Sequence, residues 1–309
     1  MVPVLHIIIT IILIAELVLG NLSNSFIVLK NFIDWINKIE LSTIDQILII
    51  LSISRISLIW ETVLLWVKDQ LISSITIKEL KIIMFSLILS SHFSLWLATA
   101  LSIFYFFRIA NCSWQIFLYL KWRLKKLIVL ILMGSLVILI ANMIQITITL
   151  EEKFYQYEGN TSVNSMETEF TILTEEVLFN MTLFSAIPFS LALIFFILLI
   201  FSLYKHLQKM QLNFRGDKDP SATAHRTALR IMVSFLLLYT MYFLSLLVSW
   251  IAQKNHSRLV HIICMITSLL CPSAHSSILI LGNSKLKQTS LWVLRQLGCR
   301  MKGQNIPTT

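Results

Sequence analysis

Seven long apolar segments alternate with polar connections along this chain. They cover about residues 4–29, 46–67, 82–107, 127–149, 181–204, 229–252 and 259–281. About 20 apolar residues in an α-helix span the roughly 30 Å hydrocarbon core of a bilayer, and every segment is at least that long. The pattern therefore predicts an all-α protein, a bundle of seven transmembrane helices that forms one domain over residues 1–309, with a tail over 282–309.

Positive charges are divided unevenly between the two sets of connections. If the N-terminus is outside, eighteen of the 25 Lys and Arg residues lie in the inner loops and the tail, and six lie in the outer loops. Cytoplasmic loops carry an excess of Lys and Arg, so we expect a multi-pass plasma-membrane protein with its N-terminus outside and its C-terminus in the cytoplasm. Over residues 285–295, apolar side chains recur at helical intervals between charges, which predicts a short amphipathic helix on the inner membrane surface.

Composition excludes several classes of function. The chain is 57% hydrophobic and 13% charged, which is outside the range of soluble domains. The net charge is +9, but the basic residues lie in short loops between apolar segments, as the topology of a membrane protein requires. We therefore expect no nucleic-acid partner. The four cysteines lack metal-site spacing, and the sequence holds no HExxH, GxSxG or glycine-rich phosphate loop. We expect neither an enzyme nor a bound metal or cofactor. A transporter is less expected, because the two halves of the chain do not repeat.

The segment 150–180 is predicted to be a long outer loop. It carries seven glutamates and a single lysine. Two Asn-X-Ser/Thr sequons lie in or at the end of it, so we expect a glycoprotein modified at Asn160 or Asn180.

Polar residues in the inner half of three apolar segments lie at similar depth. Arg55 is about 13 Å from the inner end of its segment at 1.5 Å per residue. A buried guanidinium needs several hydrogen-bond acceptors. We therefore predict an intramembrane polar network that joins the first, second and seventh helices, either as a static connection or as a switch; its members are Asn24, Arg55, Ser273, His275 and Ser276.

A second polar region lies toward the outer ends of the helices. Glu61 shares its depth with Glu16, and the two carboxylates either face each other or meet hydroxyl groups separately. Trp60 and Trp66 flank Glu61, either as part of a membrane belt or as walls of an outer cavity. The cavity hypothesis places a small, mostly apolar ligand against Trp60, Glu61, Trp66, Ser90, Ser91, Tyr239 and Tyr242.

Several short motifs resemble those of the bitter taste receptors, the type 2 taste receptor family of G-protein-coupled receptors. Residues 51–55 resemble its LxxSR motif, residues 199–203 its LxxSL motif and residues 272–276 its PSxHS motif. Residues 225–230 are similar to HxKALK, with Thr227 and Arg230 in place of the two lysines. The stretches 101–110 and 117–123 also look like this family.

The resemblance implies bitter small-molecule agonists that bind between the outer halves of the helices, and a gustducin-type G protein that couples through the inner loops. The implied pocket includes Trp66, Leu87, Ser91, Tyr242 and Met265. Two of these residues depart from the family. Many members have asparagine at the position of Ser91, and some have an aromatic residue at the position of Leu87. A pheromone-like chemoreceptor and a small-molecule transporter are the alternatives.

The inner surface supplies the candidates for contact with the G protein. Positive-inside topology accounts for most of its charges even without a partner. The candidates are Tyr105, Arg108, Lys121, Arg123, Lys125, Lys126, His225 and Arg230.

Overall fold

The computed structural model describes residues 3–71, 76–110, 115–160, 166–213 and 220–304, and α-helix is the regular secondary structure in all of these ranges. The helices are α1 (Pro3–Ile36), α2 (Thr43–Leu71), α3 (Ile77–Ile109), α4 (Gln115–Trp122), α5 (Leu124–Asn160), α6 (Met166–Asn213), α7 (Pro220–Lys254), α8 (Arg258–Gly282) and α9 (Ser284–Gln304). Seven of them, α1–α3 and α5–α8, are long and apolar enough to cross a membrane. The prediction of an all-α bundle with seven transmembrane helices is confirmed.

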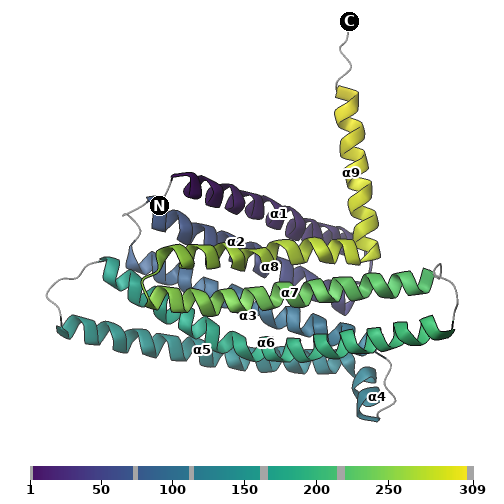
Figure 1. Ribbon diagram of the computed structural model, residues 1–309, viewed down its shortest axis with the longest axis horizontal. Coiled ribbons are helices and arrows are strands. Elements are labelled where there is room, and N and C mark those ends of the chain that lie inside the picture. Colours follow the sequence, from purple (N-terminus) through teal and green to yellow (C-terminus); the bar gives the residue numbers. More distant parts are fainter. Residues whose placement is uncertain (1–2, 72–75, 111–114, 161–165, 214–219, 305–309) are drawn as a thin grey trace, which may run out of the picture.

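The seven long helices run alongside one another, and α9 turns away from the bundle at the end opposite the N-terminus (Figure 1). Helix α3 packs against α2, α5 and α6, while α8 packs against α1, α2 and α7. The side chains of α3 are accordingly among the most buried: Ala100 and Ile103 have no exposed surface. Helix α3 therefore lies in the interior of the bundle, where its polar residues must find partners on neighbouring helices.

The outer surface of the bundle is strongly apolar. Leu130 and Val137 on α5 and Leu22 on α1 each expose about two thirds of their area. Exposed apolar area of this extent is unfavourable in water and suits contact with lipid. The surface thus agrees with the apolar pattern of the sequence, which does not distinguish the lipid-facing from the interior side of each helix.

The acidic segment 150–180 differs from the predicted loop. Helix α5 continues to Asn160 and α6 begins at Met166, so most of the segment consists of two helix ends that extend beyond the apolar runs. Lys153 of α5 forms an ion pair with Glu176 of α6 at 3.3 Å, and Lys81 of α3 lies 4.4 Å from the ring centroid of Phe154. These contacts join the extended end of α5 to α6 and to α3.

The end of the bundle away from segment 150–180 holds a short helix, α4, that the apolar pattern did not indicate. Helix α4 follows α3 and is held by aromatic contacts, since the ring of Phe117 lies 5.7 Å from that of Phe106 and 5.3 Å from that of Phe107. After α8, the side-chain oxygen of Asn283 accepts hydrogen bonds from the backbone N–H groups of Lys285 and Leu286. This capping explains why α9 begins where the sequence predicts a helix.

Candidate functional site

A chamber of about 420 Å³ lies between helices α2, α3, α6, α7 and α8, at the end of the bundle that holds the N-terminus. Most of its wall is apolar, with Leu58, Met84, Val177 and Leu246 among the lining residues. Ligand sites in proteins typically enclose roughly 300–1,000 Å³ and combine apolar walls with a few polar groups. The chamber therefore has the size and lining that a small organic molecule requires.

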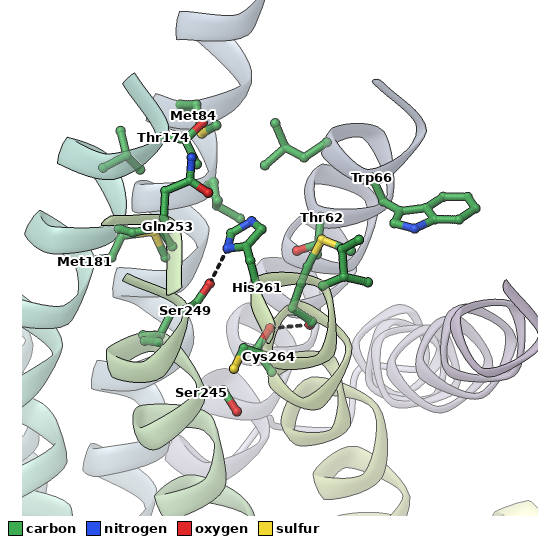
Figure 2. Close-up of a pocket in the computed structure, with 18 of the residues that line it drawn as sticks. Thr62, Trp66, Met84, Thr174, Met181, Ser245, Ser249, Gln253, His261 and Cys264 are labelled. Atoms are coloured by element: carbon green, nitrogen blue, oxygen red, sulfur yellow. Dashed lines mark hydrogen bonds between the residues drawn. The ribbon is translucent and has the colours of Figure 1, made fainter. Parts of the chain in front are cut away.

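Helix α7 supplies the polar edge of the chamber. Ser245, Ser249 and Gln253 are spaced four residues apart, so they lie on one face of this helix, and all three line the chamber. Ser249 Oγ lies 2.8 Å from His261 Nδ1 on α8, and Figure 2 shows this pair at the centre of the site. On α6, the hydroxyl of Thr174 also lines the chamber; it is buried and has no hydrogen-bond partner among the described residues.

The chamber has a positive charge at its edge. Arg258, the first residue of α8, lines it together with two histidines, His256 and His261. Among the described residues that line the chamber, none is an aspartate or a glutamate. In the same described part of the chain, His, Cys, Asp and Glu side chains form no group that could hold a metal ion.

Four of the nine residues predicted to bind a ligand line this chamber: Trp66, Leu87, Tyr242 and Met265. Trp66 stands at one side of it, opposite Met181 and Gln253 (Figure 2). Ser91 does not line the chamber itself. Its hydroxyl lies 2.7 Å from the hydroxyl of Tyr242, which does line the chamber.

The other four predicted residues do not line the chamber. Trp60 is half exposed on the surface of α2, where its indole N–H donates to the side chain of Asn21. Glu61 is buried and its Oε1 accepts hydrogen bonds from Ser57 at 2.8 Å, from Ser90 at 3.0 Å and from Ser86. Glu61 and Ser90 thus connect α2 to α3.

Tyr239 is placed deeper in the bundle than the chamber. Its hydroxyl donates to the carbonyl of Leu95 at 3.2 Å and lies 3.2 Å from the hydroxyl of Thr99, so it joins α7 to α3. Its ring lies 5.7 Å from that of Phe189 on α6.

The residues predicted to form an intramembrane network are brought together by the fold. Arg55 Nη1 donates to Ser276 Oγ and to His275 Nδ1, both at 2.9 Å. Ser276 in turn donates to Asn24 Oδ1 at 2.7 Å, and Asn24 donates to the carbonyl of Pro272 at 3.1 Å. Helices α1, α2 and α8 are therefore joined by side-chain hydrogen bonds.

Helix α1 approaches this network closely at Gly20. A side-chain carbon at this position would lie 2.5 Å from Ile59 Cδ1 and 2.7 Å from Ser273 Oγ. Because the two helices lie close together here, the hydroxyl of Ser273 on α8 donates to the backbone carbonyl of Glu16 on α1 at 3.1 Å. An added methyl group would force the side chains of Ile59 and Ser273 to shift, so the glycine lets α1 lie this close to α2 and α8 without displacing them.

The residues predicted to face a G protein lie at the other end of the bundle. Arg108, Arg123, Lys125, Lys126 and Arg230 are exposed, whereas Tyr105 and Lys121 are half-buried. Lys121 donates to the backbone carbonyl of Ala110 at 3.2 Å and thereby joins α4 to the end of α3. The side chain of His225 lies outside the described part of the structure.

The two predicted glycosylation sites differ in their surroundings. Asn160 is the last residue of α5, and its side chain lies outside the described part. Asn180 is 1% exposed within α6, where its amide donates to Gln145 of α5 at 3.4 Å. A glycan cannot be attached to a side chain packed between two helices, so the structure argues against modification at Asn180.

The sequence did not indicate many of the polar residues that line the chamber, including Thr174, Ser245, Ser249, Gln253, Arg258 and His261. The four-residue spacing of the α7 residues was the available signal. The contributions of α6 and α8 had no comparable signal, because they depend on how these helices are rotated in the bundle.

Comparison with known proteins gives the family of the chain. Residues 1–298 match the family model described as Taste receptor protein (TAS2R). The chain is 82% identical to mouse Taste receptor type 2 member 124 and 77% identical to rat Taste receptor type 2 member 124, over the full length of both chains in each case. It is 49% identical to human Taste receptor type 2 member 13 over 286 residues, which is 92% of this chain and 94% of the human one. With its seven membrane-spanning helices, the chain belongs to the taste receptor type 2 family of G-protein-coupled bitter-taste receptors of the plasma membrane.

Proposed function

We propose that the chamber between α2, α3, α6, α7 and α8 is the agonist site of this bitter receptor, and that it opens to the outside of the cell. The observation that carries this proposal is the combination of a volume of about 420 Å³ with apolar walls and a hydroxyl-rich edge on α7. The charge distribution of the connections supports the orientation, because it puts the N-terminal end of the bundle outside.

The lining also restricts the chemistry of the agonist. Arg258 supplies a positive charge, while the described residues around the chamber supply no carboxylate to pair with a cationic ligand. Ser249, Thr174 and Gln253 offer hydrogen bonds to neutral polar groups. We therefore expect neutral or anionic bitter molecules with an apolar body, and we expect cationic ones to bind weakly.

The signal has to reach the other end of the bundle. Tyr242 lines the chamber and its hydroxyl is paired with that of Ser91 in the interior of α3. An agonist that contacts Tyr242 favours the active state only if it binds that state more tightly than the resting one. In the active state the basic residues exposed at the inner end contact a gustducin-type G protein, together with the half-buried Lys121 and Tyr105; the exposed residues are Arg108, Arg123, Lys125, Lys126 and Arg230. His225 stays a candidate from the sequence alone.

The two alternative functions are less well supported. The relatives reported above carry the name of taste receptors, which favours neither a pheromone receptor nor a transporter. Agonist-evoked calcium release that requires a co-expressed gustducin-type α-subunit is expected of the receptor. Uptake of the compound into cells without that subunit would instead indicate a transporter.

A matched pair of substitutions on α7 tests the location of the agonist. Ser245 lines the chamber and donates only to the carbonyl of Met241 in its own helix, so Ser245→Phe fills the chamber without breaking a bond between helices. Its neighbour Leu244 is half exposed on the lipid-facing side, and Leu244→Phe is the control. For an agonist found by a compound screen, we expect Ser245→Phe to raise the half-maximal concentration at least tenfold at equal surface expression. An equal effect of both variants would refute the proposed site.

A further inference from the structure

A second, much smaller cavity lies deeper in the bundle, between α3, α5 and α6. It encloses about 20 Å³ and is bordered by Met181, a residue that also lines the agonist chamber. A cavity needs at least about 10–15 Å³ to hold one water molecule. The cavity is thus large enough for a single water and too small for any group of an agonist much larger than a hydroxyl.

Three of the side chains that line this cavity have a buried polar atom without a partner in the described structure. These atoms are Nε2 of His92, Nε1 of Trp96 and Oδ1 of Asn142. The three residues are 6%, 5% and 2% exposed, so bulk water does not reach them. A buried polar group that makes no hydrogen bond is costly, and three beside one cavity imply a shared partner.

The remaining polar side chains around the cavity are already paired. The hydroxyl of Ser91 pairs with that of Tyr242, and the hydroxyl of Ser185 donates to the backbone carbonyl of Thr182 at 3.0 Å. Neither of them therefore competes for the three unpaired atoms. Among the described residues that line the cavity, the side chains with an unpaired buried polar atom are therefore His92, Trp96 and Asn142.

The hydrogen-bonding types of the three atoms define their partner. The neutral imidazole of His92 has one N–H and one acceptor nitrogen. Because the backbone carbonyl of Ser135 on α5 acts on this ring as an acceptor, we assign the N–H to Nδ1 and the acceptor to the unpaired Nε2. Oδ1 of Asn142 is also an acceptor, whereas the indole N–H of Trp96 is a donor. The partner must donate twice and accept once. Water does this, but an alcohol has a single O–H to donate and an ammonium ion has nothing that accepts.

We propose that one structural water molecule binds in this cavity, donates to His92 and Asn142, and accepts from Trp96. Buried waters typically make about three hydrogen bonds to otherwise unpaired groups, as this one does. Through them the water joins α3 to α5, the helix with the smallest buried share among the seven spans. The water site is independent of the identity of the agonist.

A density map of the purified receptor at a resolution that shows ordered waters tests this site directly. We expect one isolated peak at about 2.7–3.2 Å from each of the three atoms. Asn142→Leu, which keeps the approximate size and removes the acceptor, should abolish the peak. Ser185→Ala, in the same cavity wall, should keep it, because the Ser185 hydroxyl is bonded within its own helix. A map of the unsubstituted receptor in which Asn142 bonds His92 or Trp96 directly, or in which the cavity contains no peak, would overturn the proposal.

Thermal unfolding gives a second test that does not require a map. Trp96→Phe removes the donor and keeps the aromatic packing, so this variant is expected to fold even if Asn142→Leu does not. If one water connects the two residues, the loss in melting temperature for the double variant is smaller than the sum of the two single losses. Additive losses from Asn142→Leu and Trp96→Phe would mean that the two side chains share no water. If Asn142→Leu does not fold, Asn142→Ala takes its place in the same cycle.

Discussion

Arg55 Nη1 lies 2.9 Å from Nδ1 of His275, a nitrogen that has to be an acceptor because a guanidinium carries only donors. His275 is therefore bound as the tautomer protonated at Nε2, and its ring stacks on Phe235 of α7 at a centroid distance of 4.0 Å. Arg55 Nε has no partner among the described residues. One arginine thus connects α2 to α8 directly and to α7 through a stacked ring.

Replacement of Arg55 should affect signalling more than surface expression if this connection changes between receptor states. Arg55→Ala removes the donor for both His275 and Ser276, and we expect the calcium response to fall by at least tenfold while a substantial fraction of the receptor still reaches the surface. Surface level and response have to be measured on the same cells. Normal signalling at a normal surface level would show that the connection has no role in the switch.

Gly20 allows α1 to lie close to α2 and α8, and a methyl group there should loosen this contact. In Gly20→Ala the new carbon would meet Ile59 and Ser273, and overpacking of this kind costs about 1–3 kcal/mol of folding free energy. The matched control is Gly134→Ala on α5, where an added carbon meets nothing within 4 Å. We expect a lower melting temperature for Gly20→Ala only; equal melting temperatures for the two variants would contradict the close approach.

The sequence was sufficient to predict the seven helices and the members of the Arg55 network. Both follow from one-dimensional information, since the length of an apolar run defines a membrane span and the rise per residue gives the depth of Arg55, Asn24 and His275. The hydrogen bonds among them could be anticipated because a buried guanidinium must have acceptors near its own depth.

The lining of the chamber could be predicted only in part. Trp60 and Trp66 are equivalent as aromatic residues near the end of α2, yet Trp66 lines the chamber and Trp60 is half exposed on the surface. The difference is the rotation of α2 about its axis, which the sequence does not record because both sides of the helix are apolar. Arg258 and His261 were missed for the same reason, since they belong to the chamber only through the packing of α8 against α7.

Helix α9 is held to α1 by Asp34, which accepts hydrogen bonds from Lys285 at 2.6 Å and from Lys30 at 2.5 Å. The hydrogen bond to Asp34 raises the pKa of Lys285 above its ordinary value. A raised pKa means that this connection stabilises the fold at neutral pH and is lost only as the pH rises through the higher folded-state value.

Asp34→Asn should therefore free the start of α9. We expect the distances between a nitroxide spin label at Gln288 and the helix bundle to be more broadly distributed in Asp34→Asn than in the unsubstituted receptor at pH 7. In the unsubstituted receptor, we expect the same broadening only in strongly alkaline buffer. Lys287→Gln, in the same turn of α9, is the control. Unchanged distances in Asp34→Asn would show that the Asn283 cap and the packing of Leu286 are enough to position α9.

Arg258 should determine how the receptor discriminates agonists by charge. Arg258→Gln keeps a long polar side chain and removes the charge at the edge of the chamber, so we expect weaker activation by carboxylate or sulfonate agonists and little change for neutral ones. Lys254→Gln is the control, because Lys254 lies at the end of α7 with its ammonium 5.9 Å from the Trp250 ring and is not among the lining residues. Dose–response curves for a neutral and an anionic agonist of similar shape measure the effect. A parallel loss for both agonists would assign Arg258 to the structure of the α7–α8 turn rather than to recognition.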